Sequence, residues 1–317
     1  MTNNLIQSKE SALGQKQRGK KYYARLISRK ILNYLGLIIV SCFFLFPFFF
    51  MFFKAMMGNQ ESIGVPVVHF FPEKLQLTYF KKALDDDMFL WLKNTVIVVV
   101  CNCISVPLMS SLCAYGFSRL KFKTRDFWFY ATLATMMLPG SVTQVPLYSL
   151  FHSLNLLGSI RALIIPNIFG GGAMNIFLIR QFMRSIPSAL DEAATIDGAS
   201  RLRIFWSIIF PACTPIIIYV MINQFLGSWN DFSSPLIFAN AEESYTLALG
   251  IYMRYMSTIE NPFSNVKMAA GVLMCIPPII VFLFMQNFTI IHGRMYRRTP
   301  LLYIFCISMN IHYIDHI

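Results

Sequence analysis

The chain has 317 residues and a formal net charge of +12, and 56% of its residues are hydrophobic. Only 13% of the residues are charged, where soluble domains usually carry about a quarter, and 30 residues are Phe. This composition excludes an ordinary soluble protein. The basic residues cluster at the ends of apolar stretches and form no nucleic-acid recognition motif. We therefore predict a polytopic membrane protein with no nucleic-acid partner.

The first element along the chain is a basic segment, residues 1–31, which we expect to be cytoplasmic. We do not expect it to be a cleavable signal peptide, because too many polar residues precede the first apolar run and no small-residue cleavage site is present. Six apolar segments then follow, each of about the 20 residues that a helix needs to cross a bilayer. Their ranges are 32–54, 94–114, 128–150, 161–183, 205–228 and 268–291. Because lipid offers the backbone no hydrogen-bond partner, we predict an all-α fold with six transmembrane helices.

The connections between these segments differ in charge. With the N-terminus inside, the cytoplasmic pieces 1–31, 115–127, 180–204 and 292–299 hold most of the 27 Lys and Arg residues. This asymmetry predicts that both termini are cytoplasmic. The outer connection 55–93 contains Pro66, Pro72 and a solvated acidic turn, Asp85 to Asp87, and is expected to be irregular. The basic turn Arg119–Arg125 on the inner side is expected to contact lipid headgroups.

The segment 185–211 is a polar interruption between two apolar runs, and it carries the signals of a helical hairpin. Pro187 and Ser188 begin a helix, and Ser188 with Asp191 is close to a capping box. Gly198 then permits a turn that other residues would strain, and Ser200 can cap a second helix. The residues alone leave two interpretations open, a docking element for a partner protein or a hairpin lying on the lipid headgroups.

The same segment resembles the EAA loop of permease subunits of ATP-binding-cassette importers. The resemblance rests on Glu192-Ala193-Ala194-Thr195-Ile196-Asp197-Gly198-Ala199, followed by Phe205, Ile208, Pro211 and Pro215. Further matching stretches are Leu92–Thr95, Ala114–Leu120, Met137–Gly140, Val145–Tyr148 and Phe225–Phe232. Together they resemble the carbohydrate-uptake branch, in particular the subunit similar to the maltose permease G component. The resemblance covers roughly residues 30–286, a transmembrane permease domain that we bound at 32–291.

This resemblance implies a set of partners and a role for each residue of the loop. The partners are a second permease subunit, two ATP-binding-cassette ATPase subunits and an extracytoplasmic sugar-binding protein, assembled in a bacterial cytoplasmic membrane. Glu192 would make a charged contact at the ATPase, Ala193 and Ala194 would pack closely, and Asp197, Gly198 and Ala199 would shape the turn. The chain has no Walker-type phosphate loop of its own, so it is not expected to hydrolyse ATP or to need a cofactor.

Polar residues within the apolar segments are candidates for a translocation path, because placing them in lipid costs free energy. They are Asn94, Asn102, Thr143, Gln144, Asn167, Asn223 and Gln224, with Trp229 and Asn230 near the outer end of the fifth segment. The structural alternative is that such side chains join helices to one another.

Two other classes of protein receive little support. A membrane enzyme would need a catalytic or metal-binding constellation, and the five His and seven Cys show no such spacing. A secondary carrier driven by an ion gradient is the alternative function, but it would favour internal repeats and ionisable residues at mid-membrane. After about Gln286 the resemblance ends. We expect residues 292–317 to be an atypical tail, produced by a frameshift or another alteration.

Overall fold

The computed structural model describes residues 2–58, 70–72, 74–84, 86–256 and 265–295. These residues form helices and turns and contain no strand. The predicted tail 292–317 lies outside the described residues from Tyr296 onward. The helices are α1 (Thr2–Ala55), α3 (Thr78–Ala83), α4 (Asp86–Arg119), α5 (Arg125–Ala134), η1 (Thr135–Met137), α6 (Gly140–Ser153), α7 (Arg161–Gly170), α8 (Ala173–Ser185), α9 (Ala189–Ile196), α10 (Arg201–Ile204), η2 (Phe205–Ile209), α11 (Phe210–Ala212), α12 (Thr214–Trp229), α13 (Ser233–Phe238), η3 (Glu242–Ser244), α14 (Leu247–Ile251), η4 (Tyr252–Met256) and α15 (Asn265–Met295).

The chain divides into two compact units, Met1–Gln76 and Leu77–Ile317. The first unit consists mainly of α1, which continues without interruption from the basic N-terminal segment into the first apolar run. Near the C-terminal end of α1, Phe46 and Phe53 pack against Phe70 and Phe71, with ring centroids 5.2 and 5.1 Å apart. Aromatic contacts therefore order the end of this helix and the segment that follows it.

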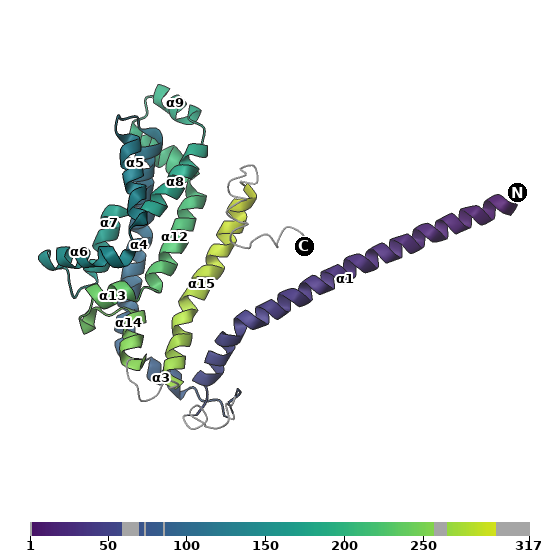
Figure 1. Ribbon diagram of the computed structural model, residues 1–317, viewed down its shortest axis with the longest axis horizontal. Coiled ribbons are helices and arrows are strands. Elements are labelled where there is room, and N and C mark those ends of the chain that lie inside the picture. Colours follow the sequence, from purple (N-terminus) through teal and green to yellow (C-terminus); the bar gives the residue numbers. More distant parts are fainter. Residues whose placement is uncertain (1, 59–69, 73, 85, 257–264, 296–317) are drawn as a thin grey trace. The chain divides into compact units, whose positions relative to one another are not determined.

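The second unit is built around α4. Helices α7, α8, α12 and α14 all pack on it, and Figure 1 shows α9 at one end of this bundle and α13 and α14 at the other. One buried cluster joins the C-terminal half of α4 to α8, α9 and the α10–α12 region, and Ile179, Met183 and Phe205 lie at its centre. A second buried cluster near the other end includes Val98, Phe151 and Phe238. The two clusters hold the elements that carry the candidate sites.

Four helices in the described part of the chain are long and apolar enough to cross a membrane. They are Lys30–Met56, Asp87–Arg119, Arg161–Ser185 and Asn265–Phe284. A fifth candidate is the pair Arg201–Ala212 and Thr214–Trp229, which bends by 75° at its break. Pro211 and Pro215 flank this break, and proline removes a backbone donor and crowds the preceding turn. Multiple membrane crossings are thus supported, although the count of six stays a prediction.

The predicted third span, 128–150, is divided in the structure. Helix α5 and the short 3₁₀ turn η1 end before Leu138, and α6 begins at Gly140. Leu138 and Pro139 between them have extended backbones. For Leu138 the cause is the proline that follows it, because the residue before a proline is disfavoured in helical geometry. The apolar run is continuous in sequence, but the helix is not.

The outer connection predicted as irregular contains regular structure. Helix α3 lies within it, and α4 begins at Asp86, well before the predicted start of the second span at residue 94. Acidic residues stabilise a helix N-terminus, because their negative charge is attracted to the positive end of the helix dipole. Asp87 also forms an ion pair with Arg254 of η4. The expected turn is therefore wrong at Asp86 and Asp87, which begin α4, although the Asp87 side chain is exposed as expected; Asp85 lies outside the described residues.

We predict that Gly171, between α7 and α8, cannot be replaced by alanine without loss of stability. Its φ is +60°, and a Cβ there would lie 2.5 Å from Ser110 Oγ and 2.8 Å from Ser110 N. Gly171→Ala should lower the free energy of unfolding by about 2 kcal/mol or more, from left-handed strain and overpacking. The matched control is Gly116→Ala, because a Cβ at Gly116 of α4 meets no atom within 4 Å. Thermal unfolding of the purified protein measures both, and equal melting temperatures would contradict this account of Gly171.

Candidate functional site

The segment that contains the EAA-like sequence forms two short helices, α9 and α10, separated by Asp197–Ser200. Gly198 has φ +79°, in the left-handed region where glycine is favoured. Ser200 caps α10, since its Oγ accepts a hydrogen bond from Arg203 N at 3.4 Å. Both features agree with the sequence-based expectation. The expected capping box is wrong, because the Ser188 side chain makes no capping hydrogen bond to α9.

Asp191 pairs with Arg119 at the end of α4 and therefore does not complete a capping box. Its Oδ2 lies 3.1 Å from Arg119 Nε, and both side chains are about nine-tenths buried. This contact is an ion pair without hydrogen-bond alignment. Arg119 Nη2 also donates to the carbonyls of Met183 and Ile186, at 2.9 and 2.7 Å. A buried charge is stable only when it is paired and hydrogen-bonded, and these contacts attach α9 and the end of α8 to α4.

The basic turn Arg119–Arg125 is therefore not a uniform lipid-facing loop. Arg119 is buried and connects α4 to α8 and α9, whereas Lys121, Lys123 and Arg125 line an open surface depression. Arg125 donates to the exposed Asp126 at 2.9 Å, and this hydrogen bond lowers the pKa of that carboxyl.

Arg180 is one of the basic residues of the inner piece 180–204 that predicted the membrane orientation, and in the structure its side chain makes two contacts with other helices. Its guanidinium lies 3.7 Å from the centroid of the Phe129 ring, and its Nε donates to Phe117 O at 3.2 Å. The contact stacks a cation on an aromatic face. It joins α8 to α5 and to the end of α4.

The α9–α10 segment has one buried side and one exposed side. Ala194 is 9% exposed and packs in the cluster with Ile204 and Phe205, and Tyr115 Oη donates to Arg201 O at 3.2 Å. Among the predicted coupling residues, Glu192, Ala193, Asp197 and Gly198 are exposed, and Ala199 is half-buried. Large apolar side chains also lie on the exposed side, where Ile196 is 86% and Leu202 is 66% exposed. The segment is thus fixed to the bundle by one face and presents the other.

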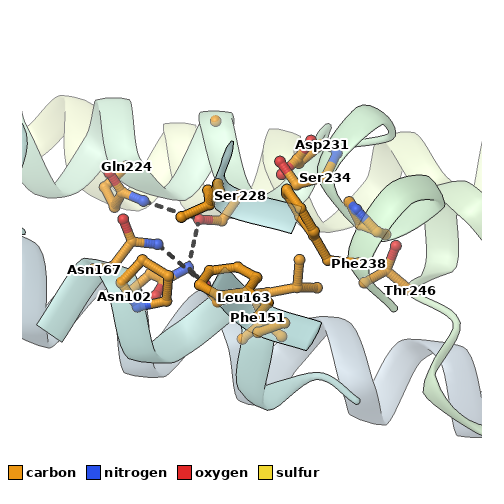
Figure 2. Close-up of a pocket in the computed structure, with 16 residues that line it drawn as sticks. Asn102, Phe151, Leu163, Asn167, Gln224, Ser228, Asp231, Ser234, Phe238 and Thr246 are labelled. Carbon is orange, nitrogen blue, oxygen red and sulfur yellow. Dashed lines mark hydrogen bonds between the residues drawn. The ribbon is translucent and has the colours of Figure 1, made fainter. Parts of the chain in front are cut away.

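A second candidate site is a cavity of about 310 Å³ near the opposite end of the second unit. It is partly open and is lined by residues of α4, α6, α7, α12 and α13, by Asp231 between α12 and α13, and by the residue before α14. Figure 2 shows its polar side chains, which come from several of these elements, and the rings of Phe151 and Phe238. The two rings meet edge to face with centroids 5.1 Å apart. The walls therefore combine aromatic surface with a few polar groups, as small-molecule sites commonly do.

A hydrogen-bond network crosses one wall of this cavity. Asn102 Nδ2 donates to Leu163 O at 3.3 Å and to Ser228 Oγ at 3.2 Å. Gln224 Nε2 donates to the same Ser228 oxygen at 3.0 Å, and Asn167 Nδ2 donates to Leu163 O at 3.1 Å. Figure 2 marks these bonds. Helices α4, α7 and α12 are thereby held together around the cavity.

The structure separates the predicted path residues into three groups. Asn167 and Gln224 line the cavity with Asn102. Asn94 and Trp229 tie elements together, since Asn94 Nδ2 donates to Glu243 O and Tyr245 O, and Trp229 Nε1 donates to Met274 O. In the last group, the side chains of Thr143, Asn223 and Asn230 donate hydrogen bonds to backbone carbonyls of their own helix. Gln144 of α6 belongs to the same group, because its side chain has no hydrogen bond to another described residue.

Four polar residues of the cavity were missed as site candidates: Ser228, Asp231, Ser234 and Thr246. Ser228 and Asp231 lie in the Ser228-Trp229-Asn230-Asp231-Phe232 motif, where only Trp229 and Asn230 were selected. The four-residue spacing of Gln224 and Ser228 places both on one helix face and was the available signal. Thr246 gave no such signal, because it comes from a segment that reads as an outer connection.

Comparisons with known proteins agree on one family. The family described as "Binding-protein-dependent transport system inner membrane component" matches residues 107–290. A putative ABC transporter permease protein, ORF2 of Caldicellulosiruptor sp. (strain Rt8B.4), is 33% identical over 252 residues, covering 78% of this chain and 89% of that protein. The trehalose/maltose transport system permease protein MalG of Thermococcus litoralis is 28% identical and covers 83% and 95%.

A solved structure shares the fold. It is the crystal structure of a bacterial ABC transporter involved in the import of the acidic polysaccharide alginate, and one of its chains aligns with a TM-score of 0.72. The identity is 22%, and the alignment covers 81% of this chain and 95% of that one. None of these matches supports a secondary carrier. The chain is a membrane transport subunit and not an enzyme, and it belongs to the family of binding-protein-dependent transport system inner membrane components.

Proposed function

We propose that the chain is the permease subunit of an ATP-driven carbohydrate importer, and that the α9–α10 segment couples it to the ATPase. The importer would contain a second permease, two ATPase subunits and an external sugar-binding protein. Family membership and the sugar permeases among its relatives support the transport role. The observation that carries the coupling role is that one face of this segment is anchored to α4 while the other is exposed.

The exposed face has the chemistry of a docking surface. Ile196 and Leu202 are largely exposed, and the exposed Glu192 lies on α9 four residues, about one helical turn, before Ile196. Exposed apolar groups rimmed by polar residues are typical of sites for a protein partner. The small side chains of Ala193 and Ala199 would allow that partner's backbone to approach closely. The hairpin would then receive the movement of the ATPase.

The anchored face supplies the connection to the membrane helices. The Asp191–Arg119 ion pair and the Tyr115–Arg201 hydrogen bond both end on the last turns of α4. A displacement of α9 or α10 would thus act directly on the C-terminal end of α4. A rigid buried contact transmits displacement better than an exposed one, because packed interiors resist compression.

We further propose six membrane crossings, with both termini on the cytoplasmic side of a bacterial cytoplasmic membrane. The third crossing would be formed by α5 and α6 together, broken at Leu138 and Pro139. The apolar side chains that these helices expose, Phe127, Trp128 and Val145 among them, suit contact with lipid or a second permease. The concentration of Lys and Arg on the inner connections favours this orientation. Among the predicted path residues, Asn167 and Gln224 are the ones we retain as substrate contacts.

The docking role predicts that Glu192→Lys disrupts assembly without unfolding the permease. Glu192 is exposed, so charge reversal should leave the fold intact while opposing a cationic or hydrogen-bond-donating partner surface. We expect at least a tenfold loss of ATPase subunit in co-purification. Glu242→Lys is the matched control, because Glu242 is also exposed but lies in η3 near α14, at the other end of the bundle. An intact complex with Glu192→Lys would count against the coupling role.

The anchoring role predicts the opposite pattern at the neighbouring carboxylate. Asp191→Asn should lower the free energy of unfolding by about 3 kcal/mol, because it removes one member of a buried ion pair. This lies at the low end for such pairs because Arg119 keeps its two carbonyl partners. Glu192→Gln should leave the melting temperature unchanged. Thermal unfolding of both purified variants tests the distinction, and equal effects would contradict it.

A further inference from the structure

A basic depression lies directly after the apolar span in α4. That span ends at Arg119, and the turn that follows it carries the exposed Lys121 and Lys123. These two residues line the depression together with Phe122 and Arg125. A helix that spans the hydrocarbon core reaches the headgroup region at its ends. The depression therefore lies at the depth where lipid headgroups are found.

Positive charge exceeds negative charge around this depression. Asp126 is the only acidic residue in the segment 120–130, and Arg125 Nε donates to its carboxylate at 2.9 Å. This hydrogen bond lowers the pKa of Asp126, and the positive charges of Arg180 and Arg184 on α8 lower it further. The start of α5 thus lies close to basic residues of another helix. The single carboxylate is already paired, and the excess of cationic groups remains available to an anionic ligand.

Exposed aromatic side chains lie beside these charges. Helix α5 is fixed to α8 through the buried Phe129, whose ring lies 3.7 Å from the Arg180 guanidinium. In contrast, Phe127, Trp128 and Tyr130 are each more than half exposed. Trp and Tyr are enriched where a helix meets the interface between membrane and water. The site therefore combines cationic groups with an aromatic surface suited to lipid.

The openness of the depression distinguishes a lipid from a soluble anion. The depression has a volume of about 550 Å³ and is open to solvent, and water and salt screen exposed charges. A small soluble anion is therefore held weakly there. A phospholipid is already concentrated at this depth, and its acyl chains add contact with the aromatic surface. Charge attraction and apolar burial then act together, as they do in membrane anchoring.

An acidic protein surface is the other occupant that this charge could attract. The exposed face of the α9–α10 segment is the surface that we assign to a protein partner. In the third crossing proposed above, α5 leads from the depression into the bilayer. Its first exposed aromatic residues, Phe127 and Trp128, therefore adjoin lipid, and this favours the lipid over the protein.

We propose that this depression binds the headgroup of an anionic phospholipid in preference to a zwitterionic one. Lys121, Lys123 and Arg125 contact the headgroup, and Phe127 and Trp128 contact the acyl chains. The bound lipid connects the turn after α4 to the start of α5. This site goes beyond the transport role and depends only on the membrane placement of these two helices.

The test is photochemical labelling of the complete purified transporter in phosphatidylcholine nanodiscs. The probe is a trace of phosphatidylglycerol that carries a diazirine beside its glycerol backbone, and mass spectrometry of the digested permease locates the label. We expect labelling within 120–130. Replacing part of the phosphatidylcholine with unlabelled phosphatidylglycerol of the same acyl chains should reduce it about tenfold, because the competitor is also anionic. Soluble glycerol 1-phosphate should not compete, because it has no acyl chain.

Charge-removing variants test the residues. Lys121→Gln combined with Lys123→Gln should reduce the labelling about tenfold, whereas Lys121→Arg combined with Lys123→Arg should retain it. The matched control is Lys81→Gln combined with Lys82→Gln, which also removes two exposed lysine charges, but from α3. The control should be labelled like the parent protein. Because all four lysines are exposed, the melting temperatures should not change.

Four results would overturn the proposal. Labelling that stays constant when phosphatidylglycerol replaces phosphatidylcholine would show lipid contact without selection by charge. Competition by glycerol 1-phosphate would assign the depression to a soluble anion. Labelling that appears only after the ATPase subunits are removed would assign it to a protein partner. Equal labelling of the parent protein and of the double glutamine variant would exclude the two lysines.

The labelling experiment is independent of the importer function. It requires neither ATP nor a sugar, so a negative result would reject the lipid site and leave the importer proposal unchanged. Carbohydrate uptake that ignores ATP, together with charge-selective labelling of 120–130, would reject the importer and support the lipid site.

Discussion

Helix α4 holds the second unit together by giving its polar side chains to the backbone of other segments. Buried in an apolar surrounding, such side chains must be hydrogen-bonded or they destabilise the fold. Five of them bond to another part of the chain. They are Asn94 (to Glu243 of η3 and to Tyr245), Thr95 (to the first residue of α14), Asn102 (to α7), Ser110 (to Gly171) and Arg119 (to the end of α8). The positions of α7, α8 and α14 therefore follow from one helix.

Both candidate sites depend on this helix. The hairpin of α9 and α10 is attached where α4 ends, through Arg119 and Tyr115. The cavity lies along the same helix at Val98 and Asn102. A single helix thus contacts both the surface proposed for the ATPase and the cavity lined by Asn167 and Gln224. Movement at one site can therefore be transmitted to the other through α4, although the two sites share no residue.

Local signals in the sequence were sufficient where structure depends on neighbours in the chain. Gly198 and Ser200 predicted the turn and the second cap of the hairpin, because a left-handed backbone and an N-cap are properties of one or two residues. Hydropathy located the apolar helices for the same reason. It failed at Leu138–Pro139, where the side chains stay apolar but the backbone leaves the helix.

Contacts between distant segments could not be predicted in this way. Asp191 looked like half of a capping box, because its true partner Arg119 lies on another helix and no local pattern joins them. Arg119 and Arg180 looked like topology signals for a similar reason, although each is fixed inside the protein. Charge counting is a valid guide to orientation, but it does not tell an arginine that faces lipid headgroups from one that ties helices.

The polar residues of the apolar segments show which property distinguishes a site from a structural tie. Asn94 and Asn102 are both buried asparagines on α4, and sequence reasoning could not separate them. The Asn94 nitrogen is satisfied by the carbonyls of Glu243 and Tyr245, and Asn94 does not line the cavity. Asn102 lines the cavity and is equally well anchored through its nitrogen, yet its buried oxygen finds no hydrogen-bond partner among the described residues. Residue type and burial are therefore shared by the two roles. What separates the two is position, because Asn102 lines the cavity and Asn94 does not, and position depends on contacts between segments that are distant in sequence.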